Sequence, residues 1–290
     1  MVIVYDDDTE SDGSPRVVAH MLAIVRYRSS WFPPYFFMHC RVLGEGVYYD
    51  TLSENSATLF NLMISALRQR LGSRVLYIEV SNLSHKMFAY RELRQQQFFP
   101  VQWMSIHNSL HSHTPEERID SKMQQRIDRA YQRGIVTKEV ENAEELNAFS
   151  NLLRRHNLFK PKRYIPSQEF FNGIVEGHHG RLFITKYKDH VIGCSACVYS
   201  GSNAFLWYAA FRRKSYAFVH PDLLTVWHAI KDAHRRGYDH IFFLDVGLPF
   251  RRNPYREFIL SFGGKPVSTF RWFRCSIGWI NRLLSWIYKD

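Results

Sequence analysis

The strongest constraint on the fold is a plan of elements that occurs twice in the chain. The segments "SATLFNLMISALRQRLG" and "HPDLLTVWHAIKDAHRRG" both carry apolar residues at helical spacing and end in a glycine, which predicts one helix in each. A short apolar strand follows each helix and ends in an acid, Glu79 or Asp245. A Tyr-Arg-Glu tripeptide then begins at Tyr90, 11 residues after the first acid, or at Tyr255, 10 residues after the second. This order predicts a tandem duplication.

The second copy is the more complete of the two. Three alternating runs, "RLFITKYKDH", "VIGCSACVYS" and "NAFLWYAAFRR", predict an antiparallel meander, and two amphipathic helices precede it at "AEELNAFSNLLRRHN" and "SQEFFNGIVEG". The first copy starts at "MVIVYDD" and has no counterpart of those helices, unless its N-terminus is clipped. We predict a reduced domain at 1–115, a helical connector at 116–134, and a complete domain with a C-terminal amphipathic helix at 135–290.

The charge of the chain favours anionic partners. The formal net charge is +11, and from Asn203 onward 14 Lys/Arg stand against 6 Asp/Glu. Such a field suits phosphates, nucleic acid or an acidic membrane surface, although a basic surface that only confers solubility is the alternative. With 46% hydrophobic residues the chain has the composition of a folded protein.

The cysteines and histidines predict no metal site. Four cysteines give no disulfide framework, which fits a reducing cytoplasm. Cys194 and Cys197 have the C-x-x-C spacing, but on a strand they would face opposite sides. The "HNSLHSH" stretch lacks partner ligands at a telling distance. No signal peptide or membrane-spanning apolar run is visible, so we expect a cytoplasmic protein that is at most peripheral to the inner face of the membrane.

The order of elements resembles the GNAT acyltransferase fold, and tandem copies joined by a helical segment resemble its FemAB-like branch. The stretches "LFITKYKDHVIGCSACVYSGSNAFLWYAAF", "HPDLLTVWHAIKDAHRRGYDHIFFLDVG" and "FILSFGGKPV" carry the resemblance. It implies an α/β (α+β) fold, with a mixed central sheet flanked by helices. It also implies transfer of an aminoacyl or other acyl group to an amine, with cell-wall peptidoglycan precursors as candidate acceptors.

One departure from the family concerns the acyl donor. Members that use acetyl-CoA carry a glycine-rich loop whose backbone N–H groups hold the pyrophosphate at a helix N-terminus. Here the loop is "AAFRRKSYAFVHPD", which contains no glycine. No tightly bound cofactor is expected, and the donor is either aminoacyl-tRNA or acyl-CoA.

The candidate site residues fall into three groups. Asp245 would orient or deprotonate the acceptor amine, and Tyr208 would donate to the developing oxyanion, although capping a loop and packing in the core are their structural alternatives. The donor's phosphates would meet Arg212, Arg213, Lys214 and Tyr216. An anionic acceptor would meet Arg251, Arg252, Lys160, Lys162 and Arg163.

Three further interpretations stay open at this stage. The enzyme could instead be an acyl-CoA-dependent N-acyltransferase acting on a lipid or small amine, or the chain could be a non-catalytic module for an anionic partner. Glu79 could orient the acceptor amine as Asp245 would, but in the reduced copy we favour a structural role. The helix at "SIGWINRLLSWIYKD" either lies in a membrane interface, beside a lipid-linked acceptor, or closes the core of the second copy.

Overall fold

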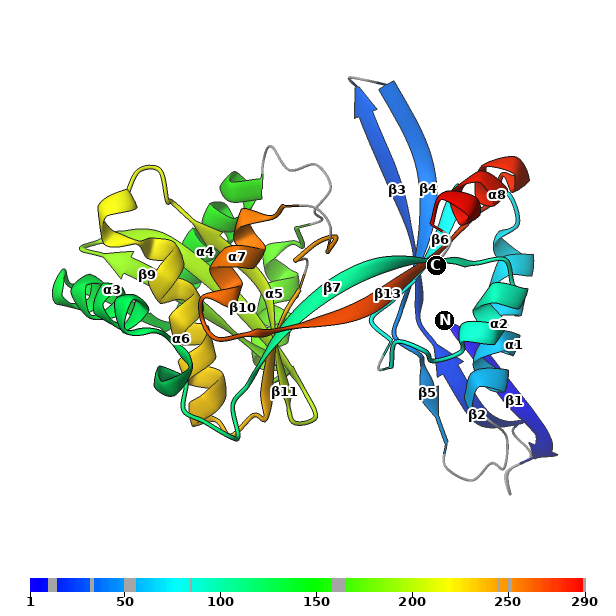
Figure 1. Cartoon of the computed structure of the whole chain (residues 1–290), viewed down its shortest axis with the longest axis horizontal. Coiled ribbons are helices and arrows are strands. Elements are labelled where there is room, and N and C mark those ends of the chain that lie inside the picture. The colour runs from blue at the N-terminus through cyan, green and yellow to red at the C-terminus, as the bar shows by residue number, and fades with distance from the viewer. Residues whose placement is uncertain are drawn as a thin grey trace. The chain divides into compact units, whose positions relative to one another are not determined.

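The structure, a computed structural model of the whole chain, describes residues 1–9, 15–31, 34–49, 56–83, 85–157, 165–244, 246–249 and 252–288. The chain divides into two compact units (Figure 1). Unit 1 comprises Met1–Met104 and Ser268–Asp290, and unit 2 comprises Ser105–Val267. Strands β7 (Phe99–Ser109) and β13 (Lys265–Cys275) carry the chain from one unit to the other.

Unit 1 contains two groups of strands, covered by helices. Its further elements are β1 (Val2–Thr9), β2 (Pro15–Met21), β3 (Ala23–Trp31), β4 (Pro34–Leu43), β5 (Val47–Tyr48), α1 (Ser56–Leu71), β6 (Tyr77–Ser81), α2 (Tyr90–Gln95) and α8 (Gly278–Ile287). Strands β1, β2 and β5 form one antiparallel sheet. In the other group β4 pairs with β3 antiparallel and with β6 parallel, and β13 pairs with β6 antiparallel.

Helix α1 forms where the spacing predicts it. Leu59, Met63 and Leu67 follow one another at intervals of four, and all three are buried in the core of unit 1. Gly72, which has a φ of +50°, ends the helix in the left-handed region, where glycine is favoured. Trp272 of β13 is fully buried in the same core.

Unit 2 is a mixed sheet with helices on both faces. Its further elements are the 3-10 turns η1 (Glu116–Arg118) and η2 (Ala217–Val219), α3 (Ser121–Gln132), β8 (Ile135–Glu139), α4 (Ala143–Asn157), α5 (Gln168–Glu176), β9 (Gly180–Tyr187), β10 (His190–Ser200), β11 (Asn203–Phe211), α6 (Pro221–Arg235), β12 (His240–Phe243) and α7 (Pro254–Leu260). The strand order is β7-β12-β11-β10-β9-β8. Among the described strand pairs of unit 2, β11–β12 is parallel and the others are antiparallel.

Alternating residues of β9 separate the two faces of this sheet. Leu182 and Ile184 pack in an apolar cluster with residues of α4 and α5. Phe183 and Thr185 contact α6, through a ring contact with His228 at 5.0 Å and a hydroxyl contact with Thr225 at 2.7 Å. Successive strand residues point to opposite faces, so α4 and α5 cover one face and α6 covers the other.

The predicted fold class is confirmed: both units are mixed α/β structures with sheets flanked by helices. The order helix, strand, helix, strand occurs as α1-β6-α2-β7 and again as α6-β12-α7-β13. The antiparallel meander is also confirmed, as β9-β10-β11.

The last strands of the two segments are exchanged between the units. β7 follows α2 along the chain yet pairs with β12 in unit 2, and β13 follows α7 yet pairs with β6 in unit 1. The C-terminal helix α8 therefore lies in unit 1, and the interpretation that it closes the core of the second copy is wrong. The boundaries 1–115, 116–134 and 135–290 concern the repeated copies and stay a prediction.

Candidate active site

Strands β11 and β12 part in the middle of the sheet of unit 2. They pair in parallel over Asn203–Leu206 and His240–Phe243. Strand β11 then continues to Phe211, and along Trp207–Phe211 its β12 side has no strand partner in the described part of the chain. Ligands of open α/β sheets bind beyond the carboxyl ends of strands, where unpaired backbone groups are accessible. We therefore place the candidate site at this opening.

The loop between β11 and α6 is folded on itself. Its amide groups donate within the loop at 3.1–3.4 Å, from Tyr216, Val219, His220 and Leu223 to the carbonyls of Arg212, Tyr216, Ala217 and His220 respectively. Pro221, the first residue of α6, has no N–H group. The start of this helix consequently offers few free amide groups to a pyrophosphate.

A buried carboxylate also occupies the first turn of α6. Asp222 is 5% exposed, and its Oδ2 atom lies 3.3 Å from the Nε atom of Arg213. Its Oδ1 atom is buried and has no hydrogen-bond partner in the described chain. An acid at this position stabilises the helix N-terminus, which an incoming phosphate would otherwise do. Our prediction from the sequence omitted Asp222, although an acid directly after a proline at the helix start is a usual sign of this role.

The predicted donor-binding residues come together in this loop. The Arg212 guanidinium lies 5.8 Å from the centre of the Tyr216 ring, and Lys214 is exposed to solvent. Arg213 is also largely exposed on the outer side of its pair with Asp222. These residues can therefore present positive charge to an anionic ligand, with only one of them paired to an acid at this loop.

The electrostatics of His220 reveal further cations around the loop. Burial lowers the pKa of His220, and the positive charges of Arg126 and Arg133 lower it further, while Asp222 acts in the opposite direction. Arg126 belongs to α3, and Arg133 is the residue directly after that helix. The start of α6 thus lies in a positive field supplied by the basic loop and by the α3 region. Our prediction from the sequence did not associate α3 with the site.

Tyr208 lies on the buried side of β11. Its side chain is 6% exposed and packs edge-on against Phe171, with ring centres 5.7 Å apart. The neighbouring end of β11 is fixed by His156 of α4, whose Nδ1 atom lies 3.2 Å from the Phe211 carbonyl oxygen. The role of Tyr208 in stabilising an oxyanion stays a prediction.

The acceptor side is described only in part. Asp245, Arg251, Lys160, Lys162 and Arg163 lie outside the described residues. Arg252 is described, and its exposed guanidinium lies 3.6 Å from Glu257. Asn253 caps α7 and donates to the Val246 carbonyl at 2.8 Å, and Arg256 donates to the Leu248 carbonyl at 2.7 Å.

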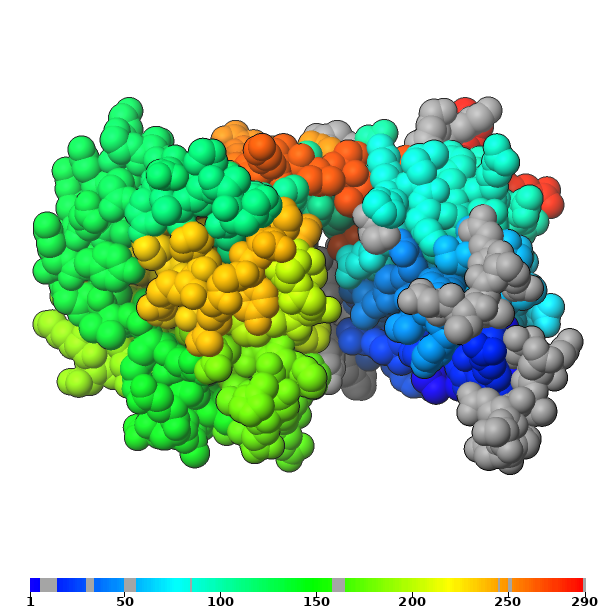
Figure 2. Space-filling view, turned by 90° about the horizontal axis from the view of Figure 1, so that it is seen from below, coloured from blue at the N-terminus to red at the C-terminus, as the bar shows by residue number. Residues whose placement is uncertain are grey.

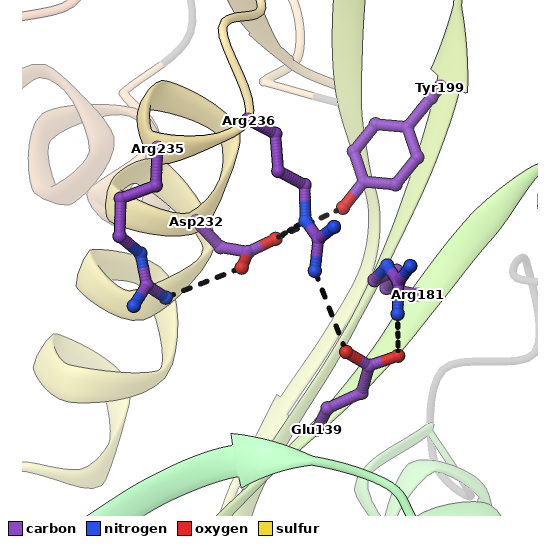
Figure 3. A network of polar contacts seen from close by, with 6 residues as sticks. All are labelled: Glu139, Arg181, Tyr199, Asp232, Arg235 and Arg236. Carbon is purple, nitrogen blue, oxygen red and sulfur yellow. Dashed lines mark hydrogen bonds and ion pairs between the residues drawn. The ribbon is translucent and has the colours of Figure 1, made fainter.

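The opposite end of α6 is anchored to the sheet by a polar network (Figure 3). Asp232, 5% exposed, accepts hydrogen bonds from Arg236 at 2.7 Å and from the Tyr199 hydroxyl at 3.3 Å. Arg236 also pairs with Glu139 of β8, which in turn binds Arg181 of β9. Figure 2 shows this golden end of α6 lying between green segments of unit 2. The network holds the helix that carries the basic loop.

Glu79, the matching acid of the first segment, is structural. Its carboxylate pairs with Arg41 at 3.3 Å and with Arg271 at 3.4 Å, and it is 8% exposed. The structural interpretation of this residue is confirmed. Among the residues described, no cluster of three or more His, Cys, Asp or Glu side chains could hold a metal ion.

Comparison with known proteins shows which family the region around this opening in the sheet is similar to. Residues 118–255 match the family described as "Acetyltransferase (GNAT) domain". No curated protein is similar in sequence.

Among solved structures, FemX is 12% identical, with 96% of this chain and 89% of that chain covered at a TM-score of 0.60. L-PGS from Bacillus licheniformis is 10% identical, with 97% and 88% covered at 0.62. A tandem GNAT protein from the clavulanic acid biosynthesis pathway is 10% identical, with 92% and 81% covered at 0.50. These likenesses show the fold, and the match of residues 118–255, which include the basic loop and the parted strands, to the GNAT acetyltransferase domain supports an acyltransferase.

Proposed function

We propose that the chain transfers an aminoacyl group from aminoacyl-tRNA onto an amine acceptor, with unit 2 holding the donor. The observation that carries this proposal is the state of the α6 N-terminus. Four amides of its loop and first turn, those of Tyr216, Val219, His220 and Leu223, donate within the loop, and the Asp222 carboxylate occupies the first turn. The pyrophosphate of coenzyme A would need those amides and would be repelled by that carboxylate.

A ribose-phosphate chain suits the same loop better. Cationic side chains, rather than a close backbone cradle, carry most contacts between proteins and nucleic acid phosphates. Arg212, Lys214 and the exposed side of Arg213 offer such contacts beside the parted strands. We therefore assign the acceptor end of tRNA to this loop.

The reaction proceeds by attack of the acceptor amine on the ester carbonyl of the aminoacyl group. A new C–N bond forms, the ester C–O bond breaks, and the tRNA ribose leaves as its hydroxyl after taking up the proton that the amine gives up. We assign to Asp245 the orientation of that amine, with Tyr208 donating to the oxyanion. Positioning and electrostatics supply the rate, without a covalent enzyme intermediate.

The acceptor is proposed to be anionic as well as an amine. Arg251 and Arg252, with Lys160, Lys162 and Arg163, supply cations in segments that follow β12 and α4 along the chain. The resemblance to the FemAB-like branch directs the search for acceptors to cell-wall precursors and lipid-linked amines at the inner face of the membrane.

Equilibrium binding and thermal shift at fixed salt test the choice of donor. The ligands are one aminoacyl-tRNA, the same tRNA uncharged, acetyl-CoA and a long-chain acyl-CoA. We expect tighter binding of charged than of uncharged tRNA. The change Lys214→Ala should weaken tRNA binding about tenfold, since a charge-assisted contact to phosphate is lost.

Arg235→Ala is the matched control, because it removes one positive charge from the other end of the same helix, about 20 Å away. A thermal shift with a CoA ester and none with tRNA would replace the proposal with acyl-CoA-dependent N-acylation. Equal affinities for both tRNAs, lowered equally by the two substitutions, would point to a basic surface that binds polyanions without catalysis.

A further inference from the structure

Unit 1 contains two adjoining hollows that the acyl-transfer chemistry does not use. The first, about 460 Å³, runs along α8 and reaches the end of α2. The second, about 350 Å³, lies at the last turn of α1. Arg274 and Ser276, from the end of β13 and the residue after it, line both. The two hollows therefore adjoin at Arg274 and Ser276.

This feature collects positive charge without any acid to balance it. Four arginines line the hollows, namely Arg68, Arg94, Arg274 and Arg282, and no Asp or Glu is among the lining residues. Like charges gathered at one place repel each other, and a bound anion relieves the repulsion. The composition of the walls thus favours an anionic ligand.

Two of these guanidinium groups have buried donors that nothing in the described chain satisfies. The Nε atoms of Arg68 and Arg274 are buried and have no hydrogen-bond partner. Burial lowers the pKa of both groups, and Arg68 lowers that of Arg274 further. A buried donor without a partner is unfavourable unless a ligand supplies the acceptor. An oxyanion in the hollows would offer several acceptor oxygens to the half-buried Arg68 and Arg274 side chains that line them.

The walls of the hollows are already in place. The Asn281 side chain accepts from the Cys275 amide at 2.8 Å and donates to the Gln97 carbonyl at 2.9 Å, which ties α8 to the end of α2. Gly278, the first residue of α8, lines the first hollow, and no side chain caps this helix start. The positive end of the helix dipole therefore lies beside the first hollow.

Helix α8 also presents an apolar stripe to solvent. Trp279, Leu283, Trp286 and Ile287 follow one helical face and are 69%, 47%, 72% and 55% exposed. Trp286 lines the first hollow as well. Figure 1 draws α8, in red, on the same upper side of unit 1 as the hairpin of β3 and β4. That hairpin exposes Tyr27 and Phe36, whose rings stack 5.8 Å apart.

We propose that the hollow around Arg274 binds the phosphate of an anionic phospholipid headgroup while the stripe of α8 lies in the membrane interface. A phosphodiester offers oxygens to the arginines that line the hollow, and tryptophans at a helix surface favour the level of the headgroups. The stripe favours a lipid over free phosphate, because a soluble ion would leave those side chains in water. No described helix has the length and apolar character to cross a bilayer, so the contact is peripheral.

Co-sedimentation of the full chain with vesicles tests the proposal. One set of vesicles is pure phosphatidylcholine, and the other contains added phosphatidylglycerol. We expect binding to the anionic set only, lowered at least about fivefold by Arg274→Gln, since an arginine near an anionic surface contributes about that factor. Trp279→Ser should weaken binding without changing the lipid preference.

Arg70→Ala is the control, because Arg70 lies two residues from Arg68 on α1 and lines neither hollow. Equal losses for Arg274→Gln and Arg70→Ala, or binding that ignores lipid charge, would overturn the proposal. Inorganic phosphate and pyrophosphate form the last arm of the test. If either raises the Tm of the parent chain but not of Arg274→Gln, while vesicles do not bind, the site serves soluble phosphates and the lipid assignment falls.

Discussion

At the scale of the residue, Asp232 shows how one buried carboxylate fixes the helix that carries the candidate donor loop. It accepts from Arg236 and Tyr199 and lies 3.3 Å from Arg235. The change Asp232→Asn keeps the shape of the side chain and removes its charge. We expect the free energy of unfolding to fall by about 1–3 kcal/mol, the range for losing hydrogen bonds between charged groups. Urea denaturation measures this.

Asp189→Asn is the control for that substitution, because Asp189 lies exposed in the turn between β9 and β10. Equal unfolding free energies for the two variants would mean that the Asp232 network does not stabilise unit 2.

Residue types predicted the basic loop, but not the partners within it. The residues "FRRK" predict positive charge in any fold. The pairing of Arg213 with Asp222, however, depends on the chain turning back through η2. The unsatisfied donor of Arg274 likewise follows from packing against residues about 200 positions earlier, to which no sequence pattern points.

At the scale of the element, the start of α4 is held by a carboxylate with a strongly shifted pKa. Glu145 receives hydrogen bonds from Lys186 at 2.7 Å and from the Glu141 amide at 3.1 Å, and Lys138 lies 2.9 Å away. Burial acts to raise the pKa of this carboxyl, but the two lysines and the amide prevail and lower it to about 2.

The shift predicts how stability depends on pH. The pKa is lower in the folded chain than the ordinary value of 4.5, so the unfolded chain takes up the proton first as pH falls. The contribution of Glu145 is complete above about pH 5 and is lost as pH falls toward about 2. Unfolding free energies measured across this range should show the parent chain losing its advantage over Glu145→Gln.

Glu144→Gln, at the exposed neighbouring position, provides the comparison and should give a curve parallel to that of the parent chain. A constant gap between the parent and Glu145→Gln from pH 7 to pH 2 would contradict the assigned pKa.

Elements with a clear period were predictable, because a helix that buries one face must repeat its apolar residues. This holds for α1, α4 and α6, and for the three strands of the meander. The parting of β11 from β12 follows from no such period. The length of β12 depends on its neighbours in the sheet, and its four residues carry no sign of where pairing stops.

At the scale of the whole molecule, the exchange of β7 and β13 could not be predicted from local sequence. Both strands mix apolar and polar residues as many strands do, and the exchange depends only on which sheet each one joins. Because pairing is set by contacts far apart in the chain, the repeat in the sequence and the compact units in space have different boundaries.

The exchange makes the C-terminal segment a part of the core of unit 1. Trp272→Ala removes a fully buried side chain from that core and should cost about 3–5 kcal/mol. Hydrogen exchange should then speed up in α1, α2 and β6, although these lie about 180 residues or more before the substitution. Trp227→Ala, in the buried face of α6, is the matched change and should act on unit 2. If Trp272→Ala instead loosened α4 and α6 and left α1 protected, residues 135–290 would behave as one folding unit and the exchange of strands would not govern stability.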